Sequence, residues 1–286
     1  MKRITGLLLG TCVLVGGLGI AMAQETTPPP KVLSIQREFI KPGKGGAPHE
    51  KGESAFVQAM TRAKWPTHYL ALNSLSGKSR ALFLTGYDSF EAWEKDFMAV
   101  QKNATLSAAL DRAAVADGDL LSDFDASALL YRDDYSLRSA VDIAHMRYFE
   151  ISLYRVRAGH NQDWDTLVKM VMAAYEKIAD VHWATYQAIY GQEGGTYVVF
   201  TPMKSAAEID QSFDHSKKFM AAMGDDMKKF SELEAATIEF SQHNWFVISP
   251  KMSYVSDEWI KADPDFWKPK ASAPAAPKKT EEKPAQ

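Results

Sequence analysis

The chain has 286 residues, of which 46% are hydrophobic and 11% aromatic, and it carries 33 basic against 36 acidic residues. This composition is typical of a packed globular protein and excludes a disordered chain. A formal charge of −3 without a basic stripe argues against nucleic-acid binding. Cys12 is the single cysteine, so the fold must rest on its core rather than on disulfides.

Residues 1–23 have the order of a secretory signal peptide. Lys2 and Arg3 precede an apolar run over 4–22, and small residues provide a cleavage site near Ala23. The alternative is a membrane anchor, because the run is nearly long enough to span a bilayer. The glycines in the run and the cleavage site favour removal. We therefore expect a periplasmic or secreted bacterial protein with no membrane span after cleavage.

The rest of the chain divides into a short linker, two halves and an extension. We place the linker at 24–31, the first half at 32–138, the second half at 139–256 and the C-terminal extension at 257–286. From about residue 268 the extension holds proline, alanine and charged residues with no aromatic residue. Such a segment buries too little apolar surface to offset the entropy of ordering, so we predict disorder there.

Two stretches of the chain repeat at a constant spacing. The stretch ALFLTGYDSFEAW begins at Ala81, and a diverged copy, YVVFTPMKSAAEI, begins at Tyr197, which is 197 − 81 = 116 residues later. The same spacing relates Ile35 to Ile151 further upstream. One such block could arise by chance, but two blocks at a shared spacing indicate an internal repeat.

Each half shows the same order of predicted elements. A strand rich in β-branched and aromatic residues ends at a glycine turn, and an amphipathic helix follows it. Two short strands joined by a glycine-containing turn come next, then a second helix that starts at a capping signal, then a last strand. The predicted strands are 32–40, 69–73, 81–85 and 126–131 in the first half, and 148–156, 186–190, 197–201 and 244–248 in the second.

This order, βαββαβ repeated twice, predicts an α+β fold. A unit of this kind forms a four-stranded antiparallel sheet with both helices on one face. The other face is bare, and two halves in one chain can cover it by packing sheet to sheet. We therefore expect two ferredoxin-like units that form a barrel within one polypeptide.

The element order, with the turns KPG at 41–43 and RAG at 157–159, resembles the dimeric α+β barrel superfamily. That superfamily includes antibiotic-biosynthesis monooxygenase-like, stress-responsive and haem-degrading proteins whose chains pair through their sheets. The resemblance extends to about Tyr254 and implies a tandem fused version of the barrel. No family-specific catalytic motif accompanies it, so it implies a fold and not a function.

The first strand of each half alternates apolar and polar side chains, and alternate side chains share a face. We expect the apolar sets to pack under the helices and the polar sets to point into the barrel, where they would line a ligand cavity. The alternative is that these polar groups hydrogen-bond one another across a closed core or at its wet rim. The candidate ligand-binding residues are Gln36, Glu38, Glu150, Tyr154, Tyr186, Tyr190, His243 and Trp245.

The sequence contains none of the familiar catalytic or metal-binding motifs. It lacks G-x-S-x-G, and its seven histidines include no H-E-x-x-H, H-x-H or H-x-x-x-H pattern. We therefore predict no catalytic residue, no metal site and no cofactor from the sequence.

Two functions are compatible with these observations. The first is a non-catalytic exported protein that binds a small hydrophobic or aromatic ligand, or a partner. The second is an enzyme, monooxygenase-like or haem-related as the resemblance implies, that acts on such a molecule between the sheets. The enzyme requires an acid–base pair such as His243 and Glu150 at a proton-transfer distance of about 2.6–3.2 Å. The sequence leaves the choice, the ligand and the oligomeric state open.

Overall fold

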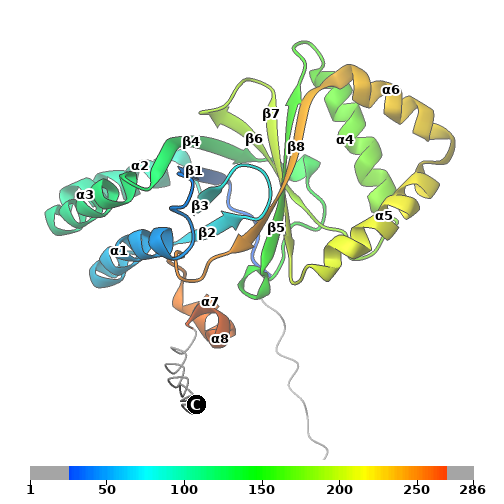
Figure 1. The fold of residues 1–286 in the computed structure, drawn as a ribbon. Helices are drawn as coiled ribbons and strands as arrows, with labels where there is room; N and C mark the ends of the chain where they lie inside the picture. The colour runs from blue at the N-terminus through cyan, green and yellow to red at the C-terminus, as the bar shows by residue number, and fades with distance from the viewer. Residues whose placement is uncertain (1–25, 269–286) are drawn as a thin grey trace, which may run out of the picture.

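Eight antiparallel strands form a closed barrel in the computed structural model, which describes residues 26–268 (Figure 1). Around the barrel the strands follow the order β1-β3-β2-β8-β5-β7-β6-β4. The predicted signal peptide and the tail beyond residue 268 lie outside the described residues. Among the described helices, none is both long and apolar enough to cross a membrane.

Each half contributes four strands and three helices. The first half holds β1 (Val32–Ile40), α1 (Ala47–Ala63), β2 (Tyr69–Ser74), β3 (Arg80–Tyr87), α2 (Phe90–Lys102), α3 (Ala104–Gly118) and β4 (Leu121–Tyr131). The second half holds β5 (Tyr148–Val156), α4 (Asn161–Tyr175), β6 (Ala184–Tyr190), β7 (Thr196–Met203), α5 (Ala207–Met223), α6 (Met227–Thr237) and β8 (Ile238–Ile248). The predicted α+β class is confirmed.

The second helix of each half differs from the prediction because it is two helices. Asn103 ends α2 and starts α3, where its Oδ1 accepts a hydrogen bond from the Leu106 N–H at 3.1 Å. Gly224 separates α5 from α6 and has φ 50°, a conformation that favours glycine. The predicted order βαββαβ has one helix at this place in each half, so it lacked α3 in the first half and the break between α5 and α6 in the second.

The two halves join at two seams between strands. Strand β2 pairs with β8, and β4 pairs with β6, both antiparallel. Within each half the strands keep the same relative order, β4-β1-β3-β2 and β8-β5-β7-β6. The seams leave no free sheet edge among these eight strands, which removes the sites at which edge strands aggregate.

The barrel interior is filled by apolar side chains from both halves. This cluster, with each member under 10% exposed, includes Leu33, Ile35, Leu70, Leu72, Leu82, Leu84, Phe149, Ile151, Tyr186, Val198, Phe200 and Phe246. The expected orientation was therefore wrong: the apolar sets point into the barrel, and the polar sets face the helices. An eight-stranded barrel is just wide enough to be filled by side chains, so its interior takes the apolar set.

Residues 116 positions apart occupy matching places in this interior. The pairs inside the barrel are Leu33 with Phe149, Ile35 with Ile151, Leu70 with Tyr186, Leu82 with Val198, and Leu84 with Phe200. The spacing seen in the sequence therefore relates equivalent strand positions of the two halves.

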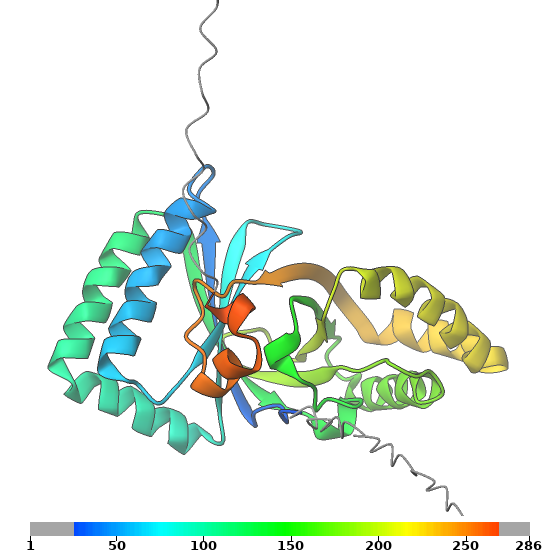
Figure 2. The ribbon, with the colours of Figure 1, turned by 90° about the horizontal axis from the view of Figure 1, so that it is seen from below.

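Helices cover the barrel on two opposite sides, and a C-terminal pair covers one end (Figure 2). The pair consists of α7 (Asp257–Ala262) and α8 (Pro264–Trp267). Trp267 is 5% exposed, belongs to the barrel core and donates from Nε1 to the Ala144 carbonyl at 3.0 Å. The extension beyond residue 256 is thus part of the packed core as far as Trp267.

Candidate functional site

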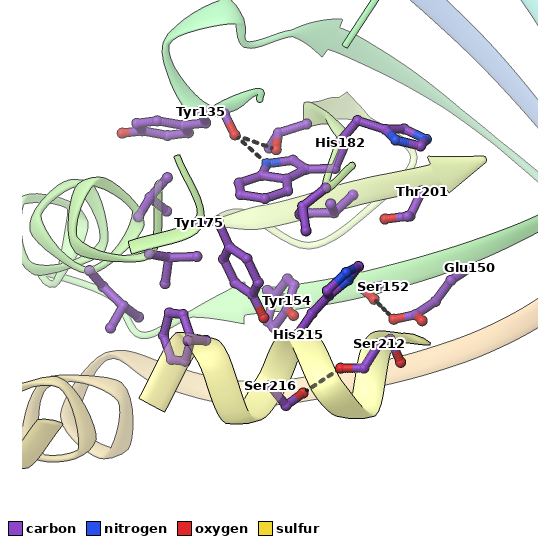
Figure 3. Close-up of a pocket in the computed structure, with 18 of the residues that line it drawn as sticks. Tyr135, Glu150, Ser152, Tyr154, Tyr175, His182, Thr201, Ser212, His215 and Ser216 are labelled. Carbon is purple, nitrogen blue, oxygen red and sulfur yellow. Dashed lines mark hydrogen bonds between the residues drawn. The ribbon is translucent and has the colours of Figure 1, made fainter. Parts of the chain in front are cut away.

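A pocket of about 440 Å³ lies between the second-half sheet and helices α4, α5 and α6. Strand β5 supplies Glu150, Ser152 and Tyr154 from its helix-facing side, because alternate residues share a face. Figure 3 shows His215 entering the pocket from α5. The volume is within the range of small-molecule sites, about 300–1,000 Å³.

Aromatic rings form much of the pocket wall. Tyr154 lies 5.7 Å from Trp164 between ring centroids, and Tyr175 stacks on Phe219 at 4.8 Å. Such arrangements present ring faces and edges to a ligand and are rigid for their size. The aromatic lining residues are Tyr135, Tyr154, Trp164, Tyr175, Trp183, Phe219 and Phe230.

The charged residues that line the pocket are all acidic. They are Glu150, Asp180, Glu208 and Glu234, and no lysine or arginine is among the lining residues. Glu208 already accepts the Lys204 backbone N–H at 2.8 Å. The pocket therefore combines aromatic walls with negative charge, and this charge opposes the entry of an anionic ligand.

Ser152 bridges a carboxylate and an imidazole at the edge of the pocket. Its Oγ lies 2.7 Å from His243 Nδ1 and 3.1 Å from Glu150 Oε1, while His243 Nδ1 and Glu150 Oε1 are 3.7 Å apart. The attraction of the nearby His243 imidazole and the hydrogen bond from Ser152 lower the pKa of Glu150 against the effect of burial, and Glu150 raises the pKa of His243.

This group lacks the geometry of a nucleophilic triad. In a triad, the base contacts the nucleophile through one ring nitrogen and its orienting carboxylate through the other. Here Ser152 and Glu150 both approach Nδ1 of His243. The separation of 3.7 Å also exceeds the range expected for direct proton transfer between His243 and Glu150. Any proton exchange between them would pass through Ser152.

The histidines of the pocket allow a test of whether its residues fit haem, which the superfamily resemblance implies as an alternative. His215 lines the pocket, and neither of its ring nitrogens has a hydrogen-bond partner in the described part of the chain, so one is free for an axial bond, although no group orients the other. His182 also lines it, but its Nε2 is 2.8 Å from the Pro202 carbonyl. No cationic side chain in the lining matches the haem carboxylates. The lining therefore fits an organic cation better than it fits haem.

The structure distributes the eight predicted residues over several surfaces. Glu150 and Tyr154 line the pocket, and the strand register places His243 and Trp245 on the same sheet face. Tyr186 lies in the barrel core. On β1 of the first half, Gln36 is exposed and Glu38 is buried, both on the helix side of the sheet. Tyr190, at the end of β6 in the second half, is 67% exposed and lies beside Phe90 of the first half.

A second pocket, of about 800 Å³, opens at one end of the barrel. Barrel-core residues such as Leu33, Phe149 and Tyr186 form its floor, and Trp259 contributes to its rim. This pocket is therefore a hollow over the apolar end of the barrel, and the space between the sheets is filled by apolar side chains instead of being the polar-lined cavity that we expected.

Sequence reasoning missed the residues that the helices contribute to both sheet–helix spaces. Trp164, Tyr175 and His215 lie on α4 and α5, and only the amphipathic stripe of α4 hinted at their position. In the first half, His49 and Glu53 stand four residues apart on α1 and face Glu38. The spacing of His49 and Glu53, a histidine and a carboxylate one helical turn apart, is the sequence signal for that pair.

No protein-family model matches the chain, and no curated protein matches its sequence. Solved structures match its fold. A proposed monooxygenase from Fusobacterium nucleatum subsp. nucleatum is 9% identical, with 77% of this chain and 93% of that chain covered and a TM-score of 0.48. An anthrone oxidase-like protein is 13% identical, with 77% and 92% covered and a TM-score of 0.46. A mutant chlorite dismutase from Candidatus Nitrospira defluvii is 8% identical, with 82% and 95% covered and a TM-score of 0.46. At these identities and TM-scores the likeness concerns the fold alone.

Proposed function

We propose that this protein binds a small aromatic molecule that carries a basic amine, in the pocket between the second-half sheet and helices α4, α5 and α6. The observation that carries this proposal is the lining itself, which pairs aromatic rings with four carboxylates and has no lysine or arginine. This narrows the hydrophobic or aromatic ligand expected from the sequence to a cationic one.

The physical basis is that a cation gains from both kinds of lining group. Ring faces attract ammonium groups electrostatically, by about 0.5–2 kcal/mol for each contact, with the larger values when the contact is desolvated. The attraction of the His243 imidazole and the hydrogen bond from Ser152 lower the pKa of Glu150 and favour its ionised form, so it offers negative charge beside Tyr154. An aromatic carboxylate of the same size would meet four like charges.

The test compares three ligands of one shape: phenethylamine, 2-phenylethanol and 3-phenylpropionate. Trp164 and Trp183 line the pocket, so tryptophan fluorescence and isothermal titration calorimetry both report binding. We expect the affinity to fall in the order amine, alcohol, carboxylate. Equal binding of all three, or tightest binding of the carboxylate, would contradict the proposal.

A pair of variants assigns the binding to this pocket. Glu150→Gln removes the charge and keeps the shape, and it should weaken phenethylamine binding about 10-fold, the loss of roughly 1.4 kcal/mol of charge-assisted interaction. The control is Asp210→Asn, which removes an exposed carboxylate on α5 that does not line the pocket. This variant should bind phenethylamine as tightly as the parent does. If both variants weaken binding equally, the ligand responds to overall charge and not to this pocket.

The enzymatic alternative rests on the hydrogen-bonded group Glu150–Ser152–His243. This group could relay a proton to or from a bound molecule, which a pure binding protein does not need. Chromatography of a ligand incubated with the protein distinguishes the two, because an enzyme converts it and a binding protein returns it unchanged. An absorption band in protein purified from its native host would favour the haem form of this alternative.

We also propose export and an origin by duplication. The order of residues 1–23 supports export, and intact mass of the protein from the periplasm of a Gram-negative host would show whether the chain begins near Gln24. The five residue pairs that lie 116 positions apart inside the barrel support a duplicated ferredoxin-like unit. In related chains, the two halves should then be more similar to each other at the 116-residue spacing than at any other spacing.

A further inference from the structure

The space between sheet and helices in the first half holds a buried group of ionisable side chains instead of a pocket. Glu38 comes from β1, His49 and Glu53 from α1, and Asp117 from the end of α3. One ligand atom from each residue lies within 4.8 Å of the others. The four residues are between 2% and 8% exposed. Three separate segments therefore converge on one small volume.

The three carboxylates surround a single imidazole nitrogen. His49 Nε2 lies 2.9 Å from Glu38 Oε2, 3.9 Å from Glu53 Oε1 and 3.8 Å from Asp117 Oδ1. One N–H can donate to one of these oxygens only, and the nearest is that of Glu38. The other two carboxylates face the same point without a donor from His49.

Several buried oxygens of the group have no partner in the described part of the chain. They are Glu53 Oε1 and both carboxylate oxygens of Asp117. Buried polar atoms are almost always hydrogen-bonded, and buried carboxylates are paired or bind a cation. Burial and the neighbouring negative charges raise the pKa of Glu53 and of Asp117, so protons are the competing occupants.

Gly52 gives a second sign that the fold makes room for Asp117. Gly52 lies in the interior of α1, where glycine costs roughly 1 kcal/mol relative to alanine. A Cβ at Gly52 would come within 2.6 Å of Asp117 Oδ1. The glycine therefore lets the Asp117 carboxylate approach the backbone of α1 and reach His49 and Glu53.

We propose that Glu38, His49, Glu53 and Asp117 bind a divalent transition-metal ion that fastens α1 and α3 to strand β1. A cation at the centre of the group satisfies all three carboxylates at once and replaces the proton on His49 Nε2. Because the group is closed to solvent, the site is structural, since a catalytic metal keeps an open position for substrate.

The ligand set selects the class of metal. One imidazole and three carboxylates suit four-coordinate Zn²⁺ best, and they suit Mn²⁺ where the carboxylates bind through both oxygens. Mg²⁺ usually retains several waters, and Ca²⁺ takes six to eight oxygen ligands. A buried group of four side chains has no room for those waters and too few oxygens for Ca²⁺. Ligand atoms around tetrahedral Zn²⁺ at about 2.05 Å are roughly 3.3 Å apart. The carboxylate oxygens lie 2.9, 3.9 and 3.8 Å from His49 Nε2, each within about 0.6 Å of this value. Small side-chain movements would bring all of them to it.

The two halves thus use equivalent positions for different purposes. The residue 116 positions after Glu38 is Tyr154, which lines the proposed ligand pocket. The metal site and the amine pocket are separate, so the failure of one proposal leaves the other intact.

The experiment uses the full mature chain, stripped with a chelator and then dialysed against Zn²⁺ or Mn²⁺. Elemental analysis should find one ion per chain for at least one of the two metals, and saturation should raise Tm by on the order of 5 °C. Co²⁺ added to the stripped parent protein should give the visible absorption of a four-coordinate ion. This measurement reports the site without any substitution. A parent chain that binds none of these metals would overturn the proposal.

Two variants localise the ion. Asp117→Asn and His49→Gln should each weaken metal binding by about 100-fold or more, since even changes to residues that only orient the ligands cost about 10–100-fold. The matched control is Asp111→Asn, an exposed residue of α3, which should bind as the parent does. Circular dichroism checks that each variant is folded. Metal binding that is unchanged in folded Asp117→Asn and His49→Gln would place the ion elsewhere and also overturn the proposal.

Discussion

Ser152 on β5 and His243 on β8 face each other across the strand pair, with Oγ and Nδ1 joined at 2.7 Å. The same hydroxyl donates to Glu150, so one serine connects the acid and the base of the second-half sheet. Each group therefore changes the titration of the other, and this has a measurable effect on stability.

We expect the His243–Glu150 pair to stabilise the protein most at mildly acidic pH. The pKa of Glu150 is lowered from 4.5, so its contribution is lost as the pH falls below this value and through the folded-state pKa. The pKa of His243 is raised from 6.5, so its contribution is lost as the pH rises above this value and through the folded-state pKa.

Urea unfolding of the parent and of His243→Gln from pH 3 to pH 9 measures this effect. The difference in unfolding free energy should be largest between pH 4.5 and 6.5 and shrink on both sides. It should stay below about 1 kcal/mol, because the two side chains are 52% and 45% exposed and solvent screens them. A difference independent of pH would show that the pair does not interact electrostatically.

Trp267→Ala should destabilise the barrel, although Trp267 lies in the C-terminal extension. The ring fills the end of the barrel core, and its Nε1 donates to the Ala144 carbonyl. Replacing a buried tryptophan by alanine costs about 3–5 kcal/mol, which urea unfolding would detect. The control, Phe213→Ala, removes a side chain that is 65% exposed and should change the stability by less than about 0.5 kcal/mol. Equal effects would mean that α8 does not stabilise the barrel.

Gly191→Ala should weaken the seam between the two halves. Gly191 follows β6 at φ 76°, and a Cβ there would overlap the Ala126 carbonyl oxygen and lie 2.9 Å from Ser127 Cα. Left-handed strain and a clash with backbone together should cost about 2 kcal/mol or more. Gly194→Ala is the matched control, because a Cβ there has nothing within 4 Å. Thermal unfolding that does not separate the two variants would argue against this close β4–β6 approach.

Gly52→Ala should destabilise the chain only while Asp117 is present. In a helix interior this change ordinarily stabilises by about 1 kcal/mol, but here the new methyl group must displace the buried Asp117 carboxylate. In an Asp117→Ala background the same change should become stabilising. A double-mutant cycle by urea unfolding measures this coupling. Stabilisation by Gly52→Ala in both backgrounds would show that Asp117 does not occupy this position.

Local patterns were sufficient to predict the order of the elements. The alternation around Ile35 and Ile151 defined strands, and the stripe through Trp164 and Leu167 defined α4, because these periodicities depend only on neighbouring residues. One helix was missed in each half: α3 was not predicted, and the break at Gly224 was missed because apolar side chains continue on both sides of it.

The candidate site was predictable only in part. Glu150, Tyr154 and His243 were selected from the sequence, and the structure places them on one sheet face. The residues on the helices could not be paired with them from the sequence, because they are distant along the chain: His215 and Ser152 line one pocket but stand about 60 positions apart. The acidic group of the first half shows the same limit, since Asp117 lies 68 positions after His49.

The sequence by itself determined the α+β class, the alternating strands and the need of each predicted sheet to cover a bare face. Only the tertiary structure decided which side of each strand became the interior. Alternation is symmetric, so it assigns two faces but does not say which one is enclosed. Closure at the β2–β8 and β4–β6 seams leaves space for apolar side chains inside, while helices bring His49 and His215 to the polar face. Both sites that we propose therefore lie between sheet and helices, on the outside of the barrel.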